Sequence, residues 1–366
     1  MKLKAIKYSW IILLGLVVAC DNGGEVVNFD RQAMLTNYAE NIIVPGYQAY
    51  QQEVNEMSNA VNAFTGNPTE ATLTDVRNAF KDAYLSWQNI SFYEFGPAMN
   101  LLLRTSSNTF PTDFIAIENN IASGFYDLNA LANSDAKGFP AIDYLLYGIA
   151  ETDAGIVDEY DNSQSTRIYL QDVTEDLKQR ISAVVEAWTI DGYSQTFIER
   201  DGTDAGSSLS MLVNTYNQHL ERFTRDAKIG IPLGIRSAGI PIPNNVEALY
   251  SGISIQLAAA NLVAIRNMYH GEYSLVSFDD PGIHDYLEAL NAQYEGGSLA
   301  DEISQRYTTA IDLINDIPEP LQTAVNDHEA DVSAAYQATQ VVVVLNKVDA
   351  SSAMGITITY ADNDGD

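Results

Sequence analysis

Apolar residues recur along most of the chain at steps of three and four, the spacing of an amphipathic helix. One such stripe runs from Tyr47 to Phe64, a second from Leu73 to Ile90 and a third from Val173 to Trp188. Strand-like segments are short. They are "GITITY" at 355–360 and "VVVVL" at 341–345, and the second suits a buried helix equally well. The pattern therefore predicts an all-α fold.

Proline and glycine mark where these helices stop. Pro45 lies upstream of the first stripe and predicts a kink or a break. The stretch "RDGTDAGSS" at 200–208 separates two halves of the chain. Helical spacing then restarts, and three residues are available as its N-cap: Asp204, Ser207 and Ser208. The segment 228–243, "KIGIPLGIRSAGIPIP", is too rich in Gly and Pro for an ordinary helix interior, so we expect an ordered connection there.

The two halves of the chain contain similar short sequences. "AIDYLLYG" at 141–148 and "GIHDYLEAL" at 282–290 share the triplet Asp-Tyr-Leu, which begins at Asp143 and at Asp285. A long helical pattern ends shortly before each copy. We interpret the chain as two helical-bundle domains, residues 29–198 and 199–366, related by an internal duplication.

The first 28 residues predict a targeting signal followed by a membrane tether. Three lysines precede a short apolar run, as in a secretory signal peptide covering residues 1–19. The run ends in a Leu-x-x-Ala-Cys pattern that resembles a bacterial lipobox. Cys20 is the only cysteine, so it has no disulfide partner in the chain. We expect Cys20 to be lipidated and residues 20–28 to tether the protein to a membrane of the cell envelope, facing the periplasm or the outer surface.

The formal net charge of −30 narrows the choice of partners. Such a surface repels nucleic acid and anionic lipid headgroups, so we expect neither as a partner. Most of the carboxylates are expected to form a solvated coat.

Several segments resemble the imelysin-like family. They occur in family order across nearly all of the chain: "SWQNISFYEFGPA", "GFPAIDYLLYG", "GSSLSMLVNTYNQHLERFTRDAKIGIPLGI", "NMYHGEYS" and "MGITITYADNDGD". The resemblance implies two all-helical, bundle-like domains, a cell-envelope location and a role in iron uptake. It also implies iron-uptake components as partners, and iron or another divalent cation as the ligand. Members of this family were first classed as metallopeptidases, because many carry a G-x-H-x-x-E motif.

The motif is altered in this chain. Gly138 keeps the glycine, but Pro140 stands where the family often has His, and Asp143 stands where it has Glu. Proline offers no metal ligand, and one carboxylate is too few to hold zinc by itself. Asp143 is therefore a weak metal candidate. The sequence argues against a peptidase, and we predict no catalytic residue.

Asp143 has two interpretations. Pro140 fits the first turn of a helix, and Asp143 would then lie near the free N–H groups of that helix and complement its dipole. Asparagine there would cost about 1 kcal/mol or less. Alternatively, Asp143 lines a site between the two domains.

Five further residues lie in the segments that carry the resemblance, and each has a structural alternative. Arg266 and Ser208 suit the recognition of an anionic group, whereas Glu94 could instead pair with Arg266 structurally. Trp87 lies on an apolar stripe and suits packing as well as ligand stacking. His270, together with His284 beside Asp285, could join a mixed site or simply cap a helix. The expected interdomain site comprises Asp143, Pro140, Gly138, Glu94, Trp87, Ser208, Arg266 and His270.

Three functions remain open. The first is a lipid-anchored, non-catalytic binding or accessory component of iron uptake that uses a cleft between the domains. The second is a metallopeptidase, which Pro140 opposes. The third is an envelope glycan-binding protein, suggested by 21 Tyr against 12 Phe, because amphipathic tyrosines suit polar surfaces.

Overall fold

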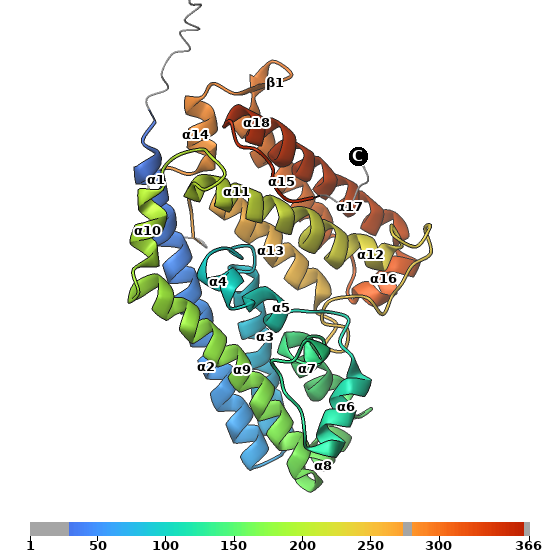
Figure 1. Ribbon diagram of the computed structural model, residues 1–366. Helices are drawn as coiled ribbons and strands as arrows, with labels where there is room; N and C mark the ends of the chain where they lie inside the picture. Colours follow the sequence, from blue (N-terminus) through green and yellow to red (C-terminus); the bar gives the residue numbers. More distant parts are fainter. Residues whose placement is uncertain (1–28, 274–279, 362–366) are drawn as a thin grey trace, which may run out of the picture.

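A computed structural model describes residues 29–273 and 280–361. Helices dominate this part of the chain, and its only strands are the two-residue pair β1 (Gln293–Tyr294) and β2 (Gly297–Ser298), joined antiparallel (Figure 1). The all-α prediction is confirmed. No helix within these ranges is both long enough and apolar enough to span a membrane.

The first half is built on three long helices. Helix α2 (Val44–Gly66) packs against α3 (Glu70–Gln88) and α9 (Gln164–Thr189), and α9 runs along α2 in Figure 1. The three apolar stripes of the sequence all point into this core, since every residue named at their ends is buried. Shorter elements complete the half: α4 (Pro97–Asn100), α5 (Leu103–Ser107), α6 (Phe114–Ser123), η2 (Leu131–Asn133), α7 (Gly138–Asp143), η3 (Tyr144–Gly148), α8 (Asp153–Asn162) and α10 (Tyr193–Glu199).

Pro45 does not break the first helix. Helix α1 (Arg31–Asn37) continues through the π-helix η1 (Tyr38–Ile43) into α2, where Pro45 occupies the first turn. The irregularity is therefore a change of helix type directly before the proline. Proline has no N–H to donate, so it is tolerated where one helical ladder gives way to another.

The second half begins with Ser207 as the N-cap of α11 (Ser208–Gln218), where its side chain accepts the N–H of Ser210. The elements that follow are η4 (His219–Gly230), α12 (Ile231–Leu233), α13 (Ser254–Tyr269), α14 (Ile283–Ala289), α15 (Leu299–Asn315), α16 (Leu321–Asp327), α17 (Glu329–Val344), η5 (Leu345–Ala350) and α18 (Ser351–Ala353). Helices α13, α15, α17 and the π-helix η4 pack together as its core.

Two local expectations change, and one open choice is settled. The segment from residue 228 remains helical as far as Leu233, and the connection begins only at Gly234. "VVVVL" is helical. "GITITY" is not a strand, because the side chain of Asn214 binds its backbone: Nδ2 donates to the carbonyl of Thr357, and Oδ1 accepts the N–H of Thr359.

Helices α3 and α13 bring the two halves together, because they pack on each other near the middle of the molecule (Figure 1). The loop 234–253, which leads into α13, reaches back to the first half at this point. The division at residue 198 stays a prediction, as does the duplication.

Candidate functional site

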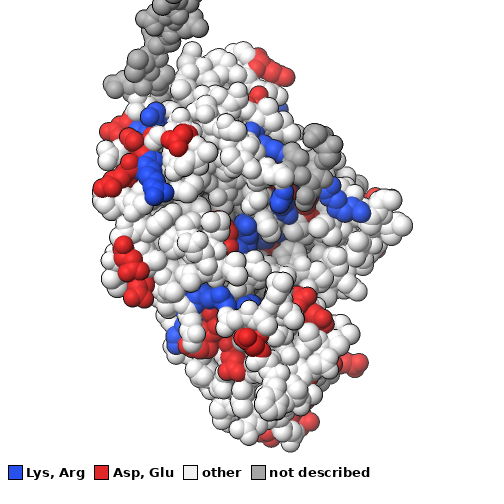
Figure 2. Space-filling view, viewed as in Figure 1, with Lys and Arg blue, Asp and Glu red and all other residues white. Residues whose placement is uncertain are grey.

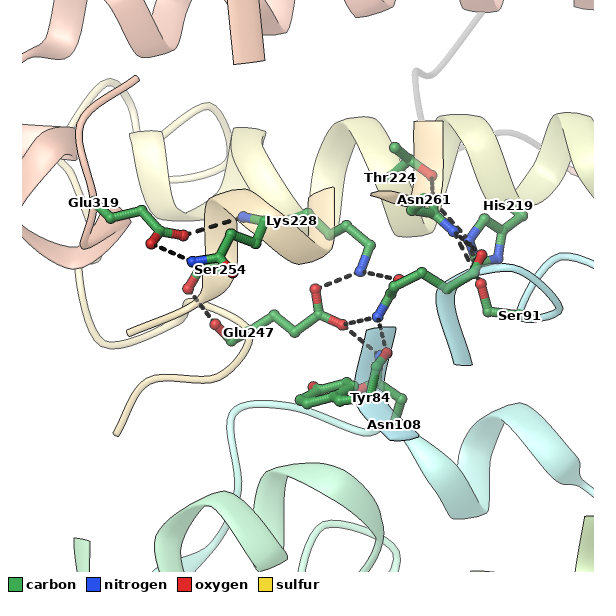
Figure 3. A network of polar contacts seen from close by, with 12 residues as sticks. Tyr84, Ser91, Asn108, His219, Thr224, Lys228, Glu247, Ser254, Asn261 and Glu319 are labelled. Carbon is green, nitrogen blue, oxygen red and sulfur yellow. Dashed lines mark hydrogen bonds and ion pairs between the residues drawn. The ribbon is translucent and has the colours of Figure 1, made fainter. Parts of the chain in front are cut away.

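A buried ion pair lies where the two halves meet. The ammonium of Lys228, on η4, contacts the carboxylate of Glu247, in the loop before α13, and both side chains are almost fully buried (Figure 3). Glu247 also accepts hydrogen bonds from Asn108 Nδ2 at 2.7 Å and Gln88 Nε2 at 3.2 Å. Burial lowers the pKa of Lys228, and the adjacent Glu247 opposes that shift.

Asn261 of α13 extends this network to His219. Its Nδ2 donates to the carbonyl of Gln88 at 3.1 Å, which fixes the amide so that Oδ1 faces His219 Nε2 at 3.2 Å. Since Oδ1 can only accept, Nε2 of His219 carries the proton and Nδ1 is left as a lone pair. Burial lowers the pKa of His219 well below its usual value, and the charges of Arg104 and Lys228 lower it further, so the ring is neutral.

The π-helix η4 places its polar residues on one face. In an α-helix, each residue turns the chain by 100°, so His219 and Lys228, nine residues apart, would lie on roughly opposite sides. A π-helix has wider turns of roughly 4.4 residues, so nine residues make about two turns. His219 therefore reaches Ser91 and Asn261, Lys228 reaches Gln88 on the same side of η4, and Thr224 reaches Asn261 at 2.6 Å.

A small cavity of about 20 Å³, with a mostly apolar lining, adjoins the network. That volume admits one water-sized group. Residues from both halves line the cavity: Trp87, Gln88, Ser91, Arg104, Asn108, Phe110, His219, Phe223 and Lys228. Three of these residues carry a buried nitrogen without a hydrogen-bond partner in the protein, namely Trp87 Nε1, Arg104 Nη1 and His219 Nδ1.

Glu94 binds the backbone of Arg104, which lines this cavity. Both carboxylate oxygens of Glu94 accept the backbone N–H of Arg104, at 3.1 and 3.2 Å, while the guanidinium lies 4.0 Å from the ring centre of Phe223. Burial raises the pKa of Glu94 to about 7, against the pull of Arg104. The pairing of Glu94 with Arg266 is therefore wrong, and Arg266 donates to Asn267 instead.

Asp143 lines a neighbouring cavity of about 10 Å³, and Phe110 contributes to the walls of both cavities. Its carboxylate is 1 % exposed and accepts two backbone N–H groups of the second half, those of Tyr250 at 2.8 Å and Ser251 at 3.0 Å. Burial raises the pKa of Asp143 to about 6, although these hydrogen bonds oppose the shift.

The helix-start interpretation of Asp143 is wrong. Helix α7 begins at Gly138, so Asp143 is its last residue and caps none of its free N–H groups. Pro140 does lie in the first turn, as expected, and it lines the cavity with Asp143. Gly138 has φ +72°, and a Cβ there would lie 2.4 Å from the carbonyl oxygen of Ser107, so both conformation and space require glycine.

The structure separates the other predicted residues from Asp143. His270 and Arg266 lie near the C-terminal end of α13, which spans roughly 24 Å, whereas the network surrounds its N-terminal part. His270 stacks on His284 with ring centres 5.0 Å apart and faces Ser304 at 3.2 Å. Ser208 starts α11, roughly 16 Å of helix before His219.

The contacts of Asp143 do not indicate a metal site. Both of its oxygens already accept backbone N–H groups. Within residues 29–273 and 280–361, no group of three or more His, Cys, Asp or Glu side chains is arranged to hold a metal ion. Cys20 and the signal peptide lie outside the described residues.

Sequence reasoning missed Arg104, His219, Lys228, Glu247 and Asn261. Asn261 left a usable signal, because it is a single amide inside the apolar run "LAAANLVAI". A polar residue on a buried helix face needs a partner, and here that partner is a second polar group from the other half. The sequence pattern gave no comparable indication for Lys228. An α-helical period of 3.6 residues places Lys228 on the side of the helix opposite His219.

Comparisons with known proteins agree on the fold and the family. The Imelysin family model matches residues 43–348. Iron-regulated protein A of Synechococcus elongatus is 22% identical over 336 residues, which cover 87% of this chain and 86% of that protein. A crystal structure described as an iron-regulated protein A precursor from Parabacteroides distasonis has a TM-score of 0.73 at 20% identity, covering 88% of this chain and 94% of the other.

An imelysin-like protein from Psychrobacter arcticum has a TM-score of 0.70 at 17% identity and covers 91% of this chain and 99% of that structure. These two structures support the shared fold. The family model spans well over half of the sequence, and the chain therefore belongs to the imelysin family.

Proposed function

We propose that this protein is a lipid-anchored, non-catalytic binding component of iron uptake in the cell envelope, and that it binds its ligand at the cavity between the two halves. Family membership and the relative named iron-regulated protein A support the link to iron. The predicted lipidation of Cys20 supplies the anchor, and residues 20–28 supply the tether before α1.

The observation that carries the proposal is the cavity with three unpartnered nitrogens. A buried polar atom left without a partner costs about 1–3 kcal/mol, so native proteins rarely leave several around one space. Trp87 and His219 are held rigidly, since their side chains are 1 % and 2 % exposed. Such a cavity is preorganised for an occupant with polar groups.

The same residues argue for binding rather than peptide hydrolysis. Pro140 cannot replace the histidine of the family motif, and both oxygens of Asp143 are engaged by Tyr250 and Ser251. Asp143 acts here as a tie between the halves. A general base needs an oxygen free to take a proton from a bound water, and this arrangement does not favour one.

The glycan alternative loses its main support. The high tyrosine count suggested a polar binding surface, but many tyrosines are buried in the core: Tyr38, Tyr47, Tyr50, Tyr84, Tyr93, Tyr160, Tyr169, Tyr216, Tyr269 and Tyr307. Their rings pack, so the composition reflects the core.

A matched pair of tryptophan variants tests the site. Trp87 and Trp188 are both buried, and each has an indole nitrogen without a partner, but only Trp87 lines the cavity. The mature protein is titrated calorimetrically with ferric citrate and with ferrous chloride under anaerobic conditions. We expect an iron-containing ligand to bind, Trp87→Phe to weaken that binding at least tenfold, and Trp188→Phe to leave it unchanged.

Two results would overturn the proposal. Failure of every iron-containing ligand to bind would remove the binding function, and equal affinity in both tryptophan variants would move the site elsewhere. Fractionation tests the anchor separately, because Cys20→Ser should release the protein from the membrane fraction.

A further inference from the structure

The C-terminal segment, residues 356–361, is attached to the second half in the manner of a bound peptide. It follows Gly355, which has φ +68° and ends the helical chain at α18. Figure 1 shows the segment in dark red, passing from α18 over α11 on the viewed face. Within residues 29–273 and 280–361, no backbone–backbone hydrogen bond involves residues 357–361. Side chains therefore hold this part of the chain in place.

One side chain of α11 binds the backbone of the segment. The amide of Asn214 donates from Nδ2 to the carbonyl of Thr357 at 3.1 Å, and its Oδ1 accepts the N–H of Thr359 at 2.7 Å. An asparagine amide offers both a donor and an acceptor, so it can make the pair of hydrogen bonds that a neighbouring strand would make. These two contacts are to main-chain atoms, and they suit an extended peptide of any sequence.

The side chains of the segment alternate between buried and exposed positions. Ile356 is 5% exposed, and Ile358 and Tyr360 are half-buried, whereas Thr357 and Thr359 are exposed. This period of two is that of an extended chain with one face on a surface. The second half therefore contacts the first, third and fifth residues of the segment.

The fifth residue has the most specific surroundings. The hydroxyl of Tyr360 donates to Oε2 of Glu221 at 3.0 Å, and burial and the charge of Glu221 raise the pKa of the phenol, which keeps its proton. The ring centre lies 5.8 Å from the guanidinium carbon of Arg222 and 5.5 Å from the ammonium of Lys347. Figure 2 shows Lys and Arg side chains on this face, around the helix that α11 and η4 form in Figure 1. A tyrosine suits this position because a ring beside cations and a hydroxyl donor are both used.

This surface is separate from the cavity between the two halves. Glu221 follows His219 by two residues on η4, which in a π-helix turns the chain by about 160°. The side chain of Glu221 therefore lies on the opposite side of η4 from His219. Binding at the surface around Glu221 does not depend on the proposed binding of iron.

We propose that Asn214, Glu221 and the surface around them form a binding site for an extended peptide, which the chain's own C-terminal segment occupies. When the segment detaches, the site accepts a segment of the same pattern from a partner chain. That pattern has apolar side chains at the first and third positions and tyrosine at the fifth. Asn214 holds the backbone of the bound segment, and Glu221 receives the tyrosine hydroxyl.

Fluorescence anisotropy tests the site with a labelled synthetic peptide of residues 355–361. The attached segment competes at a high effective concentration, so we expect the wild-type protein to bind the peptide weakly. Tyr360→Ala in the protein weakens the attached segment and should raise the affinity for the peptide at least tenfold. Thr357→Ala is the matched control, because it removes an exposed side chain of the same segment and should leave the affinity at the wild-type level.

Changes in the peptide and in α11 locate the binding. With the Tyr360→Ala protein, a peptide carrying Ile356→Gln should bind at least tenfold more weakly than the unmodified peptide. A peptide carrying Thr357→Gln places the same side chain one position along, on the exposed face, and should bind within about twofold. Adding Asn214→Ala to the protein should remove the gain in affinity that Tyr360→Ala gives. Circular dichroism checks that each variant is folded.

Hydrogen exchange of the wild-type protein tests detachment without any variant. The amide of Thr359 should exchange at least 100-fold faster than the slowest amides of α11, because the segment leaves while the helix stays folded. Exchange at the rate of α11 would mean that the segment opens only when the whole half unfolds, and the inference would be wrong.

Three results of the peptide titrations also overturn the inference. They are no binding to the Tyr360→Ala protein, equal affinity of the wild-type and Tyr360→Ala proteins, and equal affinity for the two glutamine peptides. None of them bears on the iron titration with the tryptophan variants, so the two proposals fail or stand separately.

Discussion

The triplet Asp-Tyr-Leu occurs once in each half, and its two aspartates make different contacts. Asp285 is the third residue of α14, its side chain is 52% exposed, and its carboxylate accepts the N–H of the N-cap Gly282 at 2.8 Å. Asp143 is the last residue of α7, is 1 % exposed, and binds two backbone N–H groups of the other half.

Position relative to the helix start explains the difference. An acid in the first turn reaches the free N–H groups of its own helix, as Asp285 does. Asp143 follows Gly138 by five residues, which is beyond that turn, so its carboxylate is available to N–H groups from another segment. One triplet thus serves as a local cap in one copy and as a tie between halves in the other.

The largest effect is expected from breaking the Lys228–Glu247 ion pair. This pair is the second contact that holds the loop 234–253, which Asp143 also binds. Lys228→Met leaves Glu247 as a buried, unpaired charge, and we expect a loss of about 3–5 kcal/mol in the free energy of unfolding. The double variant Lys228→Met with Glu247→Leu should recover most of it. Chemical denaturation measures both, with Arg77→Met, from a partly exposed pair with Asp153, as the control. A loss below about 1 kcal/mol for Lys228→Met would mean that the pair does not hold the loop.

The comparison itself is tested by Asp143→Asn at pH 7. The amide oxygen of Asn can accept only one of the two N–H groups, and its NH₂ group then faces the other. We expect a loss of about 1–3 kcal/mol in unfolding free energy, more than a helix cap would predict. Thermal and chemical melts measure it, and a change within about 0.5 kcal/mol would contradict the tie.

The pH dependence of that difference follows from the raised pKa. Folded Asp143 has a pKa of about 6, against the usual 3.8 of an aspartate, so the folded state takes up a proton first as the pH falls. Protonation therefore stabilises the wild type relative to Asp143→Asn, by roughly 1 kcal/mol between pH 7 and pH 5. Unfolding curves of both proteins at these pH values measure the gap, which should widen toward low pH. A gap that narrows would show that Asp143 is ionised with a lowered pKa.

The smallest effect is expected at the other aspartate. Asp285→Asn keeps a side-chain oxygen at the third position of α14 and removes only an exposed charge, so we expect a loss of about 0.5 kcal/mol. The same melts provide the measurement. A loss equal to that of Asp143→Asn would erase the distinction between the two copies.

Much of the fold was predictable because local apolar spacing determines it. The stripes ending at Phe64, Ile90 and Trp188 became α2, α3 and α9, and Ser207 became an N-cap. These assignments depend only on residues three or four positions apart in the sequence. The requirement for glycine at residue 138 also has a local cause, its positive φ, together with a close carbonyl.

The site was less predictable because it depends on which distant segments meet. Sequence reasoning named Asp143, Trp87 and Glu94, but it could not find Arg104 or Lys228, which matter through partners far along the chain. His270 illustrates the opposite error. It lies in a segment that resembles the family, yet α13 carries it away from Asp143, and its contacts are with His284 and Ser304.

The π-helix η4 makes the site depend on chain length as well as residue identity. Deleting one residue between His219 and Lys228 would let the ladder relax to an ordinary α-helix, in which the eight remaining steps of 100° place Lys228 about 80° around the helix from His219. Every side chain of the network could then be retained and still point away from its neighbours. Among relatives of this chain, the number of residues separating these two positions is therefore as informative as the residues themselves.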